Sequence, residues 1–359
     1  MKPSVSRAGI AAGVLSALLL GTAPAARAVS LVTHGSLVFG HGAIGEIDVN
    51  PNSDRVYVGS GFGSNGTTVL DFSNPNAPVS LGGVAGAGAG IGVNRNTGRF
   101  YTTDGTVFGS NRIREFDGAT NAQTRTSPTT VSGCGGSVAV NQLSGIVYTT
   151  TQCADALHRY DPTLGLNGTI TGVTGLGMVG SNVVVNEATG LVYARNGSVS
   201  STKVYDGTSL AQVGTIGMAI RDTDGVNNRL YFSDGTVLRQ LDGTTLLQTG
   251  FLNGEGNGAV IVDDVHNWLF TAAAGSDTVK IFDGATMTLL DSIALGAGQQ
   301  VQQLATGGDG YVYALTCTAG CASTSMAAIE VVSSVPEPAT AVILAFGLAG
   351  FGAGRRRRR

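Results

Sequence analysis

Oxygen-bearing side chains are concentrated in one short stretch of this sequence of 359 residues, Asp222–Asn228 (DTDGVNN). Alternating oxygen ligands beside a glycine are what a calcium-binding loop requires, so Asp222 and Asp224 are candidate metal ligands. The twelfth position of an EF-hand loop is Ser233 here rather than a glutamate, and a polar hairpin turn is the alternative interpretation. We expect no cofactor, and Ca²⁺ is the candidate ion if the stretch binds one.

Catalytic side chains form no recognisable set. The chain contains no G-x-S-x-G motif, and no serine lies near both a histidine and an acid in the sequence. The four histidines have no spacing that suggests a shared metal; they are His34, His41, His158 and His266. A site assembled in space from distant segments is the remaining alternative, and its candidates by position are Glu46, Asp48, Asp263 and Asp264. The sequence by itself predicts no catalytic residue.

The elements that position these residues follow an internal repeat. Each unit has an apolar pair before a polar turn, an aromatic residue after the turn, a second landmark such as EFDGAT or VYDGT, and one more β-rich stretch. Four short strands joined by Asn, Asp and Gly turns are typical of a propeller blade, so seven units predict seven blades. The aromatic residues that mark the units are Tyr57, Tyr101, Tyr148, Tyr193, Tyr231, Phe270 and Tyr313.

The two ends of the repeat array complement each other. The seventh unit stops at AIEVVSS without a fourth strand, and a spare strand, LVTHGSLVF, occupies residues 31–39. Pairing of this strand with the last blade would close the ring and cover both open edges. The predicted fold is therefore all-β over residues 29–333, a seven-bladed β-propeller of four-stranded antiparallel blades. An N-terminal signal helix and a C-terminal apolar helix are expected outside it.

The repeat pattern VN-x-x-(T/S)G-x-(V/F)Y resembles the YVTN-type β-propeller repeats of bacterial surface proteins. The resemblance extends over residues 31–332 and implies a propeller fold and a surface location. It does not imply an activity, because one fold serves many functions.

The N-terminus has the order of a secretory signal peptide. Lys2 and Arg7 precede an apolar stretch, and an A-x-A site follows at Ala26 and Ala28. We therefore expect residues 1–28 to be removed after Ala28 during export across the inner membrane.

The C-terminus, residues 334–359, also consists of distinct segments in a characteristic order. An extended Val335-Pro336-Glu337-Pro338 segment precedes the uncharged stretch 339–354, which as a helix would span roughly 24 Å. Arginines close the chain: Arg355, Arg356, Arg357, Arg358 and Arg359. This tail resembles the PEP-CTERM sorting signal of Gram-negative envelope proteins. The resemblance implies that exosortase reads the Pro-Glu-Pro segment, and that the apolar helix anchors the chain in the membrane until it is cut away.

Four cysteines in an exported protein predict two disulfides. In the third unit, an antiparallel register that places Val140 opposite Val147 also places Cys134 opposite Cys153 if it continues without interruption. Cys317 and Cys321 belong to one loop of the last unit and are expected to pair locally. Unpaired buried thiols are the alternative.

Charge limits the partners. Without the signal peptide and the tail, 13 Lys and Arg face 23 Asp and Glu, a net charge of −10. Nucleic-acid binding requires clustered basic residues, so nucleic acid is excluded.

Two hypotheses about function follow. The first is an exported, non-enzymatic propeller that exosortase sorts to the cell envelope, the outer surface or the extracellular matrix, where it binds or scaffolds a polysaccharide or an envelope protein. The second is a propeller enzyme of lactonase or lyase type, similar in appearance, with a cation in the central channel. The second requires several acidic, His or Asn side chains at one mouth of the ring.

Overall fold

A computed structural model describes most of the chain between its two ends. The described residues are 28–39, 44–60, 66–84, 86, 88–104, 110–151, 154–173, 183–196, 201–318, 321 and 323–334. The expected signal helix with Ala26, the apolar C-terminal helix, the segment 335–338 and the five arginines lie outside them. Of the two compact units, one comprises Ser30–Val332, and the other comprises Met1–Val29 with Ser333–Arg359. The first unit is the β-structure described below.

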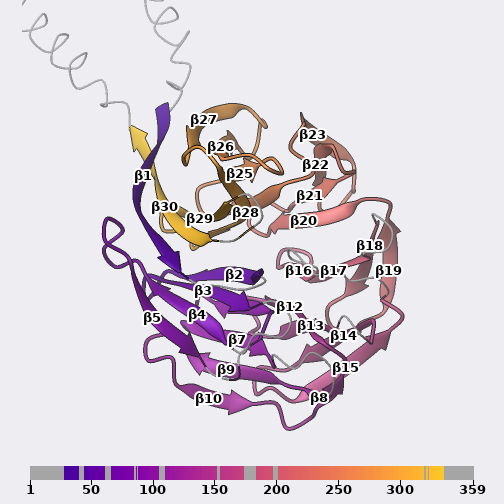
Figure 1. Cartoon of the computed structure of the whole chain (residues 1–359). Coiled ribbons are helices and arrows are strands. Elements are labelled where there is room, and N and C mark those ends of the chain that lie inside the picture. The colour runs from indigo at the N-terminus through magenta and orange to yellow at the C-terminus, as the bar shows by residue number, and fades with distance from the viewer. Residues whose placement is uncertain are drawn as a thin grey trace, which may run out of the picture. The chain divides into compact units, whose positions relative to one another are not determined.

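This unit contains seven four-stranded sheets in its described residues (Figure 1). Blade 1 contains β2 (Ile44–Asn50), β3 (Arg55–Ser60), β4 (Thr67–Asp71) and β5 (Val79–Val84). Blade 2 contains β6 (Ile91–Asn94), β7 (Arg99–Thr103), β9 (Ile113–Asp117) and β10 (Gln123–Thr126). Blade 3 contains β12 (Gly135–Val140), β13 (Val147–Thr151), β14 (Ala156–Tyr160) and β15 (Leu166–Thr171). Blade 4 contains β16 (Val183–Asn186), β17 (Leu191–Asn196), β18 (Ser201–Asp206) and β19 (Gln212–Ile216).

The remaining blades have the same composition. Blade 5 contains β20 (Ala219–Asp224), β21 (Arg229–Ser233), β22 (Val237–Asp242) and β23 (Gln248–Asn253). Blade 6 contains β24 (Ala259–Asp263), β25 (Trp268–Ala272), β26 (Thr278–Asp283) and β27 (Leu289–Ala294). Blade 7 contains β28 (Gln299–Thr306), β29 (Tyr311–Thr318), β30 (Thr324–Ser334) and β1 (Ala28–Phe39). The sequence did not predict a small additional sheet formed by β8 (Ser110–Asn111) and β11 (Val131–Ser132).

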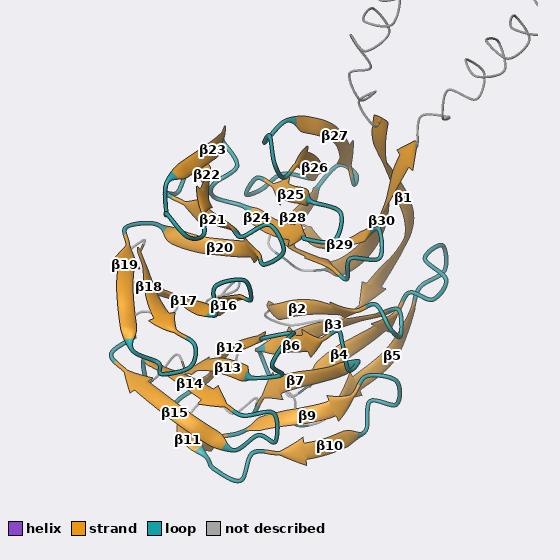
Figure 2. Cartoon of the chain, turned by 180° about the vertical axis from the view of Figure 1, so that it is seen from behind, coloured by secondary structure: helices purple, strands orange, loops and turns teal. Residues whose placement is uncertain are grey.

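The blades form a closed ring. The innermost strand of each blade contacts that of the next, in the order β2, β6, β12, β16, β20, β24, β28 and again β2. Figure 2 shows these strands around the centre and the outer strands at the rim. The predicted seven-bladed propeller of four-stranded antiparallel blades is therefore confirmed, and it is compatible with the YVTN-type resemblance.

The N-terminal strand completes the last blade, as predicted. β1 is the outer neighbour of β30, and His34 Nε2 lies 2.8 Å from Glu330 Oε2 on that strand. β1 also contacts both adjoining blades, because Leu31 N donates to Asp291 Oδ2 over 2.7 Å and Gly35 N donates to a carbonyl of blade 1 over 2.8 Å. The strand that hides the open edge thus also joins three blades.

The hydrophobic core lies between the blades. One cluster, for example, packs Phe72 of blade 1 against Tyr313 of blade 7, with ring centroids 4.9 Å apart. The aromatic residues that mark the seven units are all buried, with at most 3% exposure. Several also hydrogen-bond to the next blade: Tyr57 Oη donates to Gly118 O (3.1 Å), Tyr148 Oη to Gly207 O (2.8 Å) and Tyr231 Oη to Gly284 O (3.4 Å).

The repeated turn after each innermost strand requires positive φ. Three units place glycine there, at Gly98, Gly145 and Gly190, with φ between 67° and 71°. Other units use Asp54, Asn228 and Asn267, with φ between 52° and 59°. Because Asn and Asp tolerate the left-handed region, the turn persists where the sequence pattern departs from its consensus.

Candidate functional site

Two adjoining cavities lie at the centre of the ring. One, of about 160 Å³, is bounded by the innermost strands of blades 1 to 6. The other, of about 270 Å³, is bounded by β2, β17, β20, β24 and β28, and the two share Glu46, Ile47, Asp222 and Ile261. Together they are the central channel. Its charged side chains are Glu46, Asp48, Arg95, Glu187, Arg195, Arg221, Asp222 and Asp264.

Glu46 joins three blades through one carboxyl group. It lies on β2 and is 8% exposed. Its Oε2 accepts hydrogen bonds from Ile91 N on β6 (3.1 Å) and from Val138 N on β12 (3.0 Å), and the Ser137 hydroxyl donates to Oε1. Burial raises the pKa of Glu46 from 4.5 to about 7, and these hydrogen bonds oppose the rise.

Asp48 and Asp222 repeat this arrangement on opposite sides of the ring. Asp48 Oδ2 accepts a hydrogen bond from Val93 N of the next blade, and Asp222 Oδ2 accepts one from Val262 N of the blade after its own, both over 2.8 Å. Burial raises the pKa of both carboxyl groups, that of Asp222 to about 7. Backbone amides point into the channel at these positions, and the carboxyl groups satisfy them.

Arg95 is a basic residue among the acidic side chains that line the smaller cavity. Its Nη2 donates to Thr306 O at the end of β28 over 2.9 Å and lies 3.7 Å from Asp48 Oδ1. Burial raises the pKa of Glu187 and of Asp264, and the positive charge of Arg95 offsets part of each rise. Arg95 therefore compensates several buried carboxyl groups at once.

The structure brings together three of the four candidates for a spatially assembled site. Glu46, Asp48 and Asp264 line the same cavity. Asp263 does not: it is 1% exposed, and its carboxylate accepts hydrogen bonds from the following turn, including one from His266 N over 3.0 Å. Successive residues at the end of a strand point to opposite sides, which separates the two neighbouring aspartates.

The candidate calcium ligands serve different partners. Asp222 faces Val262 of the next blade, as described. Asp224 is fully buried, accepts a hydrogen bond from Asn227 N over 2.8 Å and lies 3.6 Å from the guanidinium of Arg229. The hairpin-turn interpretation accounts for these contacts, and a calcium role for the stretch stays a prediction. Within the described part of the chain, no group of three or more His, Cys, Asp or Glu side chains is placed to hold a metal ion.

The histidines that the structure describes have separate environments. His34 contacts the β30 glutamate noted above, and His266 lies 2.9 Å from Asp263. His158 is 4% exposed, and burial lowers its pKa to about 4. His41 lies outside the described residues.

The cysteine predictions have different outcomes. Cys317 and Cys321 form the expected local disulfide. Val140 lies opposite Val147 as predicted, but a β-bulge beyond Val138 shifts the register, so that Gly135 lies opposite Thr151. The expectation of an uninterrupted register is therefore wrong, because the bulge inserts an extra residue into β12. Cys134 is disulfide-bonded and buried, whereas Cys153 lies outside the described residues, so their pairing stays a prediction.

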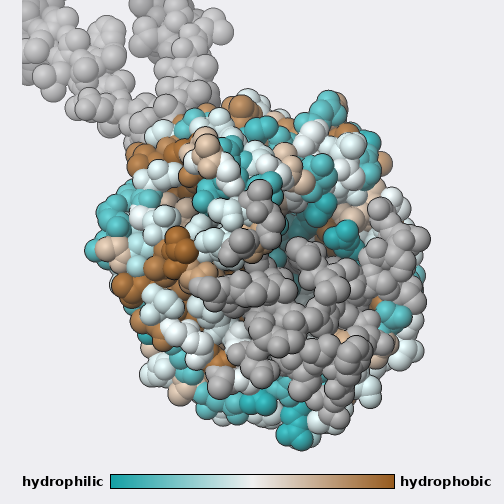
Figure 3. Space-filling view, in the orientation of Figure 1, coloured by the Kyte–Doolittle hydropathy of each residue, from teal (hydrophilic) through white to brown (hydrophobic). Residues whose placement is uncertain are grey.

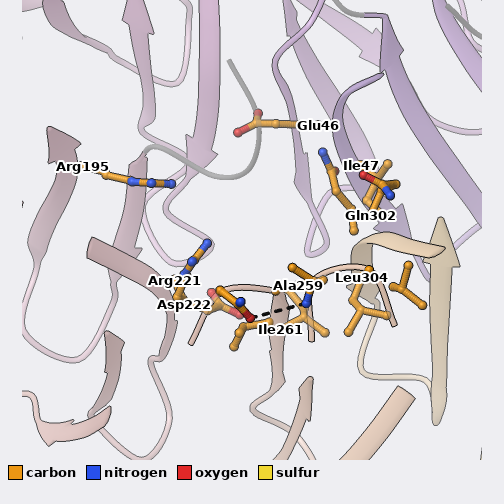
Figure 4. A pocket seen from close by; sticks show the side chains of 16 residues that line it. Glu46, Ile47, Arg195, Arg221, Asp222, Ala259, Ile261, Gln302 and Leu304 are labelled. Atoms are coloured by element: carbon orange, nitrogen blue, oxygen red, sulfur yellow. Dashed lines mark hydrogen bonds between the residues drawn. The ribbon is translucent and has the colours of Figure 1, made fainter. Parts of the chain in front are cut away.

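Two arginines of the channel were not anticipated. Arg195 lies on β17 and Arg221 on β20, and both point into the larger cavity (Figure 4). They belong to different blades and fall outside the repeat landmarks, so no sequence signal relates one to the other.

An apolar region lies on the face of the molecule seen in Figure 3. Brown, hydrophobic atoms gather along the edge of the molecule where β1 and β5 lie (Figure 3). The exposed apolar side chains of these strands are Val32, Val38, Val79 and Leu81. None of the described residues belongs to a helix long and apolar enough to cross a membrane.

Comparison with known families identifies the C-terminal tail. Residues 334–359 match the PEP-CTERM protein-sorting motif. No curated protein matches the sequence. The predicted sorting signal is thus confirmed, and it marks the chain as an exported protein that exosortase sorts to the cell surface.

Proposed function

We propose that this exported propeller is a non-enzymatic binding or scaffolding module for a glycan or a protein of the cell envelope or the extracellular matrix. Residues 1–28 are removed during export, and exosortase removes the apolar helix and the arginines after recognising Pro336, Glu337 and Pro338. What remains is the propeller, which is delivered to the outside of the cell. The class of ligand, and the delivery of the propeller to the outside of the cell, are both part of this proposal.

The observation that carries the proposal is how the channel uses its acids. Glu46, Asp48 and Asp222 each accept a backbone hydrogen bond from a neighbouring blade. Carboxyl groups engaged in this way fasten the innermost strands to one another, and this accounts for the buried acids without a catalytic role. A ring fastened at its centre and packed between its blades is a rigid support for ligand-binding loops.

The sorting half of the proposal is tested by mass spectrometry of the exported protein. Cells with active exosortase are expected to yield protein that begins after Ala28 and lacks Arg355–Arg359. Replacing both Pro336 and Pro338 by alanine should leave the arginines on the chain, because the extended segment is lost. An intact tail on the unaltered protein from such cells would contradict this half.

The binding half is tested by co-sedimentation of the exported protein with washed envelopes and with extracellular polymer from the same cells. We expect saturable binding. If the ligand is a glycan, binding should persist after the envelopes and the polymer have been heat-treated, and if the ligand is a protein, the same heat treatment should abolish binding. The proposal would be refuted if the exported protein bound neither the envelopes nor the polymer.

A second candidate function is favoured by one observation. The Glu46 and Asp222 carboxyl groups face cavities, and burial raises their pKa to about 7, the range of a general acid or base. A channel enzyme of lactonase or lyase type would use them on a small substrate. Hydrolysis of lactones by the purified protein would favour this candidate over the binding module. The activity should be abolished in Glu46→Gln, and added metal ions should not restore it.

A further inference from the structure

The larger cavity of the channel contains two arginines that share one space. Arg195 reaches it from blade 4 and Arg221 from blade 5, and Figure 4 shows both guanidinium groups directed into the same opening, across from Glu46. The remaining polar wall includes Asn257 and Gln302. We name this cavity of about 270 Å³ the arginine pocket.

Neither arginine is paired with a carboxylate. Among the described residues, Arg195 and Arg221 form no ion pair, whereas six other arginines do: Arg95, Arg99, Arg114, Arg125, Arg229 and Arg239. The internal segments outside the described residues contain no Asp or Glu. The propeller therefore has no further carboxylate to offer.

The acids nearest to the pocket are already engaged. Glu46 accepts hydrogen bonds from β6 and β12, and Asp222 accepts one from Val262 N. Arg221 donates to Gly256 O over 2.6 Å, while the buried Nε atoms of both Arg195 and Arg221 have no hydrogen-bond partner. Both guanidinium groups are directed into the cavity (Figure 4), and neither has a carboxylate acceptor among the described residues.

This arrangement opposes folding unless something neutralises it. Burial, followed by the positive charge of Arg195, lowers the pKa of Arg221 to about 10. Two like charges in a partly buried site repel each other, and each loses hydration. An anion between them would relieve both effects, in a chain whose mature part otherwise carries a net negative charge.

We propose that the arginine pocket binds the carboxylate of a small hydroxylated acid, such as the uronic acid unit of a glycan. The two guanidinium groups hold the carboxylate, because planar paired donors match its geometry. Asn257 and Gln302 offer amide groups for the hydroxyls. A volume of about 270 Å³ takes one sugar unit rather than a length of polymer. This inference deepens the proposed binding function, and its glycan identity rests on that function.

The test is calorimetric titration of the exported protein with glucuronate at constant ionic strength. Glucose, which lacks the carboxylate, and inorganic sulfate, which lacks the sugar hydroxyls, are titrated separately as comparison ligands. We expect glucuronate to bind, glucose not to bind, and sulfate to bind more weakly. Arg195→Gln and Arg221→Gln should each weaken glucuronate binding at least tenfold, the loss expected for one charge-assisted contact. Arg112→Gln removes an equal charge from an exposed arginine outside the pocket and should bind as the unaltered protein does.

Stability without ligand provides a second readout. Because each substitution removes a repulsion, we expect the Arg195→Gln and Arg221→Gln proteins to unfold at the same temperature as the unaltered protein or higher. Glucuronate at one fixed concentration should raise the unfolding temperature of the unaltered protein more than that of either variant. A purely structural role for the arginines would produce lower unfolding temperatures instead.

The outcomes separate this inference from the function on which it rests. Equal binding of glucuronate by Arg221→Gln, or tight binding of glucose, would overturn the inference. Sulfate binding as tight as that of glucuronate would overturn the assignment to a hydroxylated acid. Binding to envelope polymer without any binding of glucuronate would overturn the arginine pocket and leave the binding module in place.

Discussion

Glu46→Gln should change how folding stability depends on pH. The carboxyl group is buried among three blades, and burial raises its pKa from 4.5 to about 7. The folded protein therefore binds this proton more tightly than the unfolded chain does. It follows that the group favours folding at low pH, and that this contribution is lost as pH rises from about 4.5 to about 7.

The size of the effect follows from the two pKa values. Each pKa unit corresponds to about 1.4 kcal/mol, so the rise from 4.5 to about 7 makes the folded state about 3 kcal/mol less stable at pH 8 than at pH 4, through this group alone. A glutamine resembles the protonated acid: its oxygen can accept from Ile91 N and Val138 N, and its amide can donate to the Ser137 hydroxyl. The variant keeps the contacts and does not titrate.

Urea unfolding, followed by circular dichroism and by fluorescence of the single tryptophan, Trp268, gives the free energy of unfolding at each pH. The difference between the unaltered protein and Glu46→Gln should change by about 3 kcal/mol between pH 4 and pH 8, with the variant gaining as pH rises. Asp222→Asn should behave in the same way, because its pKa is also raised to about 7. Parallel stability curves for the unaltered protein and Glu46→Gln would refute the reasoning.

Three further predictions concern how the ring is held together. Tyr148→Phe removes the 2.8 Å hydrogen bond to Gly207 O, to which Arg159 Nη1 still donates over 3.3 Å, and should cost about 0.5–1.5 kcal/mol in urea unfolding; no loss would show that the hydroxyl contributes nothing to stability. In Gly207→Ala, the new Cβ would lie 2.6 Å from Gly190 O and 2.7 Å from Tyr148 Oη, so we expect a loss of about 1–3 kcal/mol, measured in the same way. Deletion of residues 31–39 exposes the edge of β30, and we expect oligomers in size-exclusion chromatography; a monomer with unchanged stability would contradict the closure role of β1.

Much of the fold could be predicted from the sequence because each blade repeats the same local chemistry. An apolar pair, an Asn or Gly turn and a buried aromatic residue specify a hairpin wherever they occur, so the number of copies equals the number of blades. The missing strand after AIEVVSS and the spare strand at residues 31–39 predicted how the ring closes. The sorting tail could also be predicted from the sequence, because exosortase recognises a contiguous segment.

The candidate site was predicted only in part, for a physical reason. Glu46, Asp48 and Asp264 could be placed near the channel by their position in the repeat, but their hydrogen-bond partners lie in other blades. The bulge in β12 likewise depends on neighbouring strands, and it changed the register on which one disulfide prediction was based.

The sequence by itself determined that this chain is exported, sorted by its tail and built from seven similar blades, because those features depend on neighbouring residues. Only the tertiary structure decided what its charges do. Arg195 and Arg221 are 26 positions apart and belong to different repeats, and they meet because β17 and β20 adjoin the same cavity. Packing of blade 4 against blade 5 sets that proximity, and no local pattern encodes it.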